Sequence, residues 1–130
     1  MTAAATRPHI AAVTALLTGA GLTVLPGGEG SPVAPCVVLW ASPGTPTPGS
    51  IGLVDSDLVV EVTTVAVGGT SDQAMWVADK ITAALNRAKP TVSGRTVHAM
   101  TLSAATPVRR EDNLAAPLFS ASLVWRLHTT

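Results

Sequence analysis

The chain has 130 residues, with eight Lys plus Arg balanced by eight Asp plus Glu. This length has room for one domain, and we expect residues 1–130 to share one hydrophobic core. The chain has a net charge of zero and so lacks the excess positive charge that attracts proteins to nucleic acid. Binding to free DNA is therefore not expected. Only 12% of the residues are charged, and so thinly charged a surface indicates burial in contacts with other subunits.

No segment reads as a targeting or membrane-spanning element. The apolar stretch 10–25 resembles a signal peptide, but Gly19, Gly21 and Pro26 interrupt it. No apolar run approaches the roughly 20 residues that a membrane-spanning helix needs. Cys36 is the single cysteine and cannot form an internal disulfide, so we expect folding in a reducing cytoplasm.

The first part of the chain predicts a helix, a short extended piece, a strand and a long loop. Residues 8–20 have apolar side chains at helical spacing, and residues 22–25 favour a short extended segment. The run 36–40 is rich in residues that favour strands. Many Pro and Gly residues in 42–57 predict a long, mobile loop. The apolar positions of the first helix are Ile10, Val13, Leu16 and Leu17.

The segment 58–67 is the clearest strand pattern in the chain. Leu58, Val60 and Val62 share one face, as the alternation of side chains along a strand requires. The side chains predicted on the opposite face are Glu61 and Thr63. Glycines at 68 and 69 are expected to end the strand.

A second helix follows at once. Thr70 and Gln73 have the spacing of a capping box, and Asp72 complements the helix dipole in the first turn. We expect the helix to run to about Lys89, before Pro90. Its predicted core stripe is Ala74, Val77, Ala78, Ile81, Ala84, Leu85 and Ala88.

The remaining chain predicts two strands around a polar loop. Residues 96–104 and 118–128 alternate as strands, and residues 107–117 are expected to form the loop. The inward face of the last strand is predicted to be Phe119, Ala121, Leu123, Trp125 and Leu127. The order helix, strand, strand, helix, strand, strand indicates an α+β fold with an antiparallel-rich sheet covered by helices on one face.

Catalytic and metal-binding signatures are not found in the sequence. Cys36 lies within an apolar strand, where it is expected to pack as a small hydrophobe. The glycine-rich run 27–30 lacks the Lys and Ser/Thr of a phosphate-binding loop. His98 and His128 have no further ligands at metal-binding spacing, so a structural role is the simpler reading. We therefore expect a protein that is not an enzyme and that has no cofactor.

Candidate interface residues are easier to find. Trp76 lies about 100° from Val77 around the helix, so we expect it at the edge or on the exposed face, and Trp is enriched in interface hot spots. Packing over the sheet edge is the alternative. Asp55 and Asp57, which precede a strand, are also candidate interface residues; their spacing suggests a cation site or paired acids, although two carboxylates in such a loop more often form a solvated turn. A charge cluster in the last loop is either solvated or a contact with another subunit: Arg109, Arg110, Glu111 and Asp112.

Several short segments together resemble the tail terminators of long-tailed actinobacterial bacteriophages. The resemblance covers roughly the last three-fifths of the chain. None of its motifs is a catalytic signature. The segments are Asp55-Ser56-Asp57-Leu58-Val59, Gln73-Ala74-Met75-Trp76-Val77-Ala78-Asp79, Val92-Ser93-Gly94-Arg95, Pro107-Val108-Arg109-Arg110-Glu111-Asp112 and Pro117-Leu118-Phe119.

The resemblance implies a structural virion protein of the tail or neck, assembled in the host cytoplasm. Such subunits form a homo-oligomeric ring, usually a hexamer, at the head-proximal end of the tail tube. The expected partners are the tail-tube protein and a head-completion or stopper protein, with genome DNA passing through the lumen and no membrane contact. The family has no cofactor or catalytic residues to carry over.

Other interpretations stay open from the residues alone. The chain could be a ferredoxin-like dimeric ligand-binding domain or enzyme, although it is short of convergent polar groups. It could also be another small neck or tail-tube subunit, or part of a phage-derived injection device. The form of the polymer separates a tube subunit from a terminator, because a terminator stops at a ring.

Overall fold

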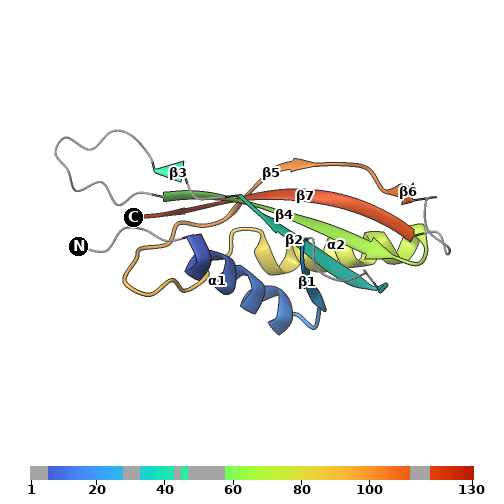
Figure 1. The fold of residues 1–130 in the computed structure, drawn as a ribbon, viewed down its shortest axis with the longest axis horizontal. Helices are drawn as coiled ribbons and strands as arrows, with labels where there is room; N and C mark the ends of the chain where they lie inside the picture. The colour runs from blue at the N-terminus through green and yellow to red at the C-terminus, as the bar shows by residue number, and fades with distance from the viewer. Residues whose placement is uncertain (1–5, 28–32, 43–44, 47–57, 112–117) are drawn as a thin grey trace.

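Two helices pack on one face of a twisted mixed sheet (Figure 1). The structure, a computed structural model, describes residues 6–27, 33–42, 45–46, 58–111 and 118–130. Within these ranges the elements are α1 (Thr6–Gly19), β1 (Val24–Pro26), β2 (Cys36–Ala41), β3 (Thr45–Pro46), β4 (Leu58–Gly68), α2 (Ser71–Leu85), β5 (Thr101–Ala105), β6 (Arg109–Glu111) and β7 (Leu118–Thr129).

The sheet has β4 and β7 at its centre. Strand order across it is β1-β2-β4-β7-β5, with β3 also paired to β4 and β6 also paired to β7. Every pair is antiparallel except β1 with β2. The α+β class, the antiparallel-rich sheet and the helices on one face are thus confirmed, whereas ring formation stays a prediction.

The main core lies between the helices and the inward faces of β4 and β7. The register pairs Val60 with Leu127 and Val62 with Trp125, so the two alternating patterns face the helices together. Helix α2 adds three large, fully buried side chains, each contributing roughly 1.5 to 3 kcal/mol before entropy is subtracted. They are Val77, Ile81 and Leu85.

The start of α2 follows the predicted capping box. The backbone N–H of Gln73 donates to the Thr70 hydroxyl at 3.1 Å, and the Gln73 side-chain oxygen accepts from the backbone N–H of Gly69 at 2.7 Å. The Gln73 side chain therefore bonds to Gly69, the residue before the N-cap, whereas in a standard capping box it bonds to the N-cap residue itself. Thr70 has extended backbone angles, as an N-cap requires.

The end of α2 differs from the prediction. The helix ends at Leu85, four residues before Lys89, and Arg87 takes a φ of 60°. Its backbone N–H donates to the Met100 carbonyl at 2.9 Å, and the Met100 N–H donates to the Ala88 carbonyl at 2.8 Å. Tertiary hydrogen bonds to the segment before β5 thus replace the last helical turn.

Two regions expected to be loops contain strands. Within the expected loop 42–57, β3 pairs with β4, and the other residues from 43 to 57 lie outside the described ones. Within the expected loop 107–117, β6 pairs with the start of β7. Strand β6 forms because β7 has 12 residues, extends past β5 and offers further backbone groups for pairing.

The expected strand 96–104 is shorter than predicted. Residues 96–98 meet the C-terminal end of the chain through three backbone hydrogen bonds, two between Thr96 and Thr130 and one from His98 to His128, and an isolated bridge from Val97 to Thr129. The continuous strand begins at Thr101, because Met100 turns to pair with Ala88. A register shift between Leu102 and Ala104 marks a bulge.

Candidate assembly surfaces

Ionisable groups do not converge in the part of the chain that the structure describes. No three His, Cys, Asp or Glu side chains there could hold a metal ion together. Cys36 is 3% exposed and packs with Val38 and Val67, which confirms the prediction that it packs as a small hydrophobe. Burial raises the pKa of its thiol, and a backbone hydrogen bond at Val33 offsets part of that rise. No helix among the described residues is long and apolar enough to span a membrane.

The three histidines have structural surroundings. The rings of His98 and His128 stack with centroids 4.6 Å apart and an angle of 12° between their planes. His9 is fully buried on the inner side of α1, a position that the sequence reading did not assign. Its Nε2 lies 2.7 Å from the Thr129 hydroxyl oxygen, so α1 is tied to the end of β7.

Arg95 completes this buried junction. Its Nε donates to the Thr129 hydroxyl at 2.7 Å, and its Nη2 donates to the Thr129 carbonyl at 3.1 Å. The arginine belongs to one of the segments quoted for the resemblance. Its contacts tie the end of β7 to the connection between α2 and β5.

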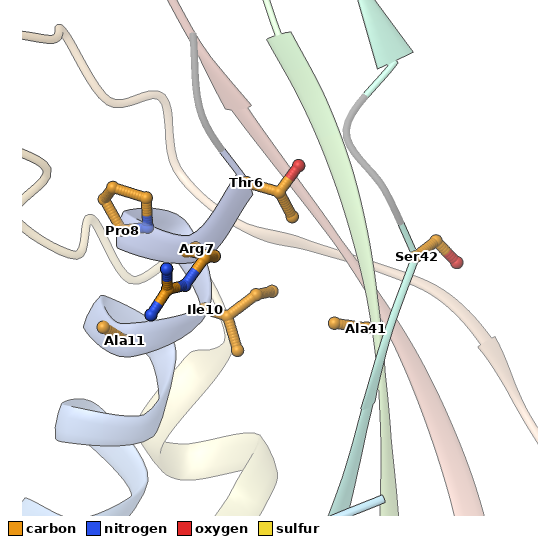
Figure 2. Close-up of a pocket in the computed structure, with 7 residues that line it drawn as sticks. All are labelled: Thr6, Arg7, Pro8, Ile10, Ala11, Ala41 and Ser42. Carbon is orange, nitrogen blue, oxygen red and sulfur yellow. The ribbon is translucent and has the colours of Figure 1, made fainter.

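A broad groove of about 960 Å³ lies between the N-terminal turn of α1 and the end of β2. Figure 2 shows Ile10 of α1 and Ala41 of β2 facing one another across it. Arg7 is the one charged residue among the described residues that line it. One cation without a second converging ionisable group does not form a catalytic site.

Trp76 is exposed, as its angle to Val77 around the helix predicted. It is 49% accessible on the outer side of α2, and the Lys80 ammonium lies 4.8 Å from its ring centroid, an attractive cation–π geometry. Lys80 also donates to the Ala20 carbonyl at 3.5 Å. Residues at positions i, i+4, i+7 and i+11 line one side of a helix. We call Asp72, Trp76, Asp79 and Ala83 the outer stripe of α2, and each is exposed.

A small hollow adjoins the outer stripe. It has a volume of about 260 Å³ and lies where the end of α1 meets α2. Three of its four lining residues are alanines, which leave room for a side chain from outside. The lining residues are Ala20, Lys80, Ala83 and Ala84.

The predicted charge cluster lies at the sheet edge. Arg109, Arg110 and Glu111 form β6 and are exposed, while Asp112 lies outside the described residues. The Glu111 carboxylate accepts from the Ser120 hydroxyl at 3.2 Å. Strands β5 and β6 lie one after the other along β7 (Figure 1). Asp55 and Asp57 also lie outside the described part, so their predicted interface role stays a prediction.

The face of the sheet away from the helices holds an apolar cluster that the sequence reading missed. Cys36, Val38 and Val67 are buried there, with the half-buried Val65 and Leu118 packed against them. Residue Trp40, 50% exposed, follows on β2. Toward the other end of β4 this face becomes polar, with Arg126 paired to Glu61 at 3.4 Å. The continuous apolar run of β2 is the signal for a strand with apolar side chains on both faces.

Comparison with known proteins finds a shared fold and no sequence family. No protein-family model matches the chain, and no curated protein matches it significantly. A chain in a solved structure described as the virion of a native gene transfer agent (GTA) particle is similar over 92% of both chains, with a TM-score of 0.67 and 19% identity. At that identity the likeness shows the fold.

Proposed function

We propose that this chain is a structural subunit of a phage-like virion, and more specifically a tail terminator. In this role it forms a ring at the head-proximal end of the tail tube, stops tube growth and joins the tail to head-completion proteins. The observation that carries the proposal is the fold shared with a chain of the GTA virion over 92% of both chains. The short segments that resemble tail terminators support the finer assignment, which includes a ring of six.

The surfaces fit an assembly role better than a catalytic one. Large apolar side chains are exposed on both layers, Met75 and Trp76 on α2 and Trp40 on β2. Such residues favour burial against another protein. Chemistry would require titratable groups that converge in a pocket, and the described residues scatter theirs.

A ring also explains how growth of a tube would stop. A contact between two different surfaces of one subunit closes into a ring when its rotation closes. Bound to the end of a tube, such a ring covers the growing end and offers no equivalent new one. A chain with a formal net charge of zero lets DNA pass through the lumen without strong attraction.

The ring is tested by imaging the purified chain with negative-stain electron microscopy and measuring its mass by light scattering. The proposal expects closed rings of one size, with a mass six times the 13.1 kDa of the subunit. Long tubes formed by the chain alone would instead identify a tail-tube subunit. A dimer that retains a small molecule would favour the ferredoxin-like ligand-binding interpretation.

A further inference from the structure

We propose that the outer stripe of α2 and the β5–β6 edge are the two halves of one contact between neighbouring copies of this chain. The inference rests on the proposed ring and names the surfaces that build it. The stripe with its adjoining hollow would receive the exposed edge of the next copy. Because the two surfaces differ, the contact is heterologous, which is the kind that generates rings.

The first support is charge complementarity. The stripe has two exposed carboxylates, Asp72 and Asp79, on either side of Trp76. The facing edge has two exposed guanidinium groups, Arg109 and Arg110. Opposite charges across an interface fix its register and speed the encounter.

Each surface also has one group of the opposite sign. Lys80 lies over the Trp76 ring and contacts the Ala20 carbonyl, and Glu111 accepts from Ser120. Two carboxylates and one ammonium leave the stripe with a formal charge of minus one, and two guanidinium groups and one carboxylate leave the edge with plus one.

The second support is shape. Leu102 is 44% exposed on β5. Edge strands usually carry charged side chains where they meet solvent, so an exposed leucine there is unusual. The hollow between α1 and α2 has an alanine-rich lining that accepts such a side chain. Trp76 lies beside it and would cover the contact from water.

The third support is spacing. Leu102 pairs with Trp125 and Arg110 pairs with Phe119, so both lie on the face of the sheet that points to the helices, about 20 Å apart along β7 at the usual rise of a strand. On α2, Asp72 and Ala84 are about 18 Å apart at the usual rise of a helix. A neighbour that places Leu102 in the hollow therefore brings Arg110 to Asp72.

The test uses two variants of the full chain, each disabled on one surface. The stripe variant is Asp72→Lys/Trp76→Ala, and the edge variant is Leu102→Ser/Arg110→Glu. A matched control for the stripe variant is Ser71→Lys/Met75→Ala, which changes adjacent exposed residues of the same helix and also places a lysine in the first turn.

Arg7→Glu is the control for the edge variant, because it reverses an exposed charge beside β2, across the sheet from β5 and β6. Circular dichroism and thermal melting establish that every variant is folded. Loss of a hot-spot residue weakens a contact by about thirtyfold. Each disabled variant alone is therefore expected to be a monomer in native mass spectrometry under conditions in which the wild type and both controls form rings.

Mixing the two disabled variants gives the decisive result. The intact stripe of one should bind the intact edge of the other, and the disabled halves should prevent further growth. We expect a one-to-one dimer at twice the 13.1 kDa subunit mass.

Three results would overturn the inference. If each disabled variant still forms the wild-type ring, the ring stands and this contact is wrong. If the variants remain monomers when mixed, they disrupt different contacts, and the pairing is again wrong. If the wild type neither forms a ring nor caps a tube, the proposed function fails first and the inference fails with it.

Discussion

The buried hydrogen bond between Trp125 and Thr64 predicts a measurable coupling in the core. The indole Nε1 of Trp125 donates to the Thr64 hydroxyl oxygen at 3.1 Å, and the Thr64 hydroxyl donates to the Leu123 carbonyl at 3.2 Å. Both side chains are fully buried. Thr64→Val keeps the shape of the side chain and leaves the indole N–H without its acceptor. Such an orphaned donor costs about 1 to 3 kcal/mol.

A double-mutant cycle isolates this bond. Trp125→Phe removes the donor and costs stability through lost packing. In that background Thr64→Val no longer orphans an N–H, so its effect should be smaller by on the order of 1 kcal/mol. Thr63→Val is the matched control, because Thr63 is the adjacent residue on the opposite face of β4.

The assay is urea or thermal unfolding of the four proteins of the cycle. For a domain of this size, 1 kcal/mol moves the thermal midpoint by about 3 to 5 °C. The reasoning is refuted if the effects of Thr64→Val and Trp125→Phe add to within about 0.3 kcal/mol. It is also refuted if the Thr63→Val control destabilises the protein as much as Thr64→Val does.

Three further predictions concern local features. Gly68→Ala places a Cβ 2.3 Å from the backbone nitrogen of Ala74, so β4 and α2 must separate, and unfolding experiments should show a loss of about 1 to 3 kcal/mol; unchanged stability would contradict this close approach. Thr70→Ala removes the acceptor for the Gln73 N–H and should cost about 0.5 to 2 kcal/mol, whereas Thr70→Ser should restore most of it. Burial raises the pKa of the Cys36 thiol, which lowers the fraction of reactive thiolate at a given pH; alkylation should therefore be slow in the folded chain and faster in urea, and equal rates would show that Cys36 is accessible.

The central elements could be predicted because their patterns are periodic and bounded. The strand that became β4 alternates cleanly, and the capping box at Thr70 and Gln73 marks the start of α2. Leu58, Val60 and Val62 are all buried, as the alternation required. Local chemistry decided these positions, so local reasoning was sufficient.

The errors lie where distant segments decide the structure. The end of α2 depends on backbone hydrogen bonds that Met100 forms with Arg87 and Ala88. The spacing of apolar residues along a helix does not indicate such contacts. Strand β6 has the composition of a solvated loop and forms because β7 offers it a free edge. These outcomes follow from backbone hydrogen-bond satisfaction across the sheet.

The candidate surfaces were predictable in part. Trp76 was assigned a place at the edge or on the outer face of the helix from its angle to Val77, and it is exposed. The hollow beside it brings together α1 and α2, and no local pattern indicates that meeting. His9 was missed although it precedes Val13 and Leu17 at intervals of four. That spacing was the available signal for its burial.

A polymerisation assay shows whether this chain ends the growth of a tail tube. The tail-tube subunit of the same virion is allowed to polymerise with and without the purified chain, and tube lengths and ends are recorded by electron microscopy. The proposed terminator role predicts that the chain lies as a ring at one end of each tube and that capped tubes no longer elongate when fresh subunits are added. Tubes that continue to grow at the same rate, with the chain bound along their length or not at all, would contradict it.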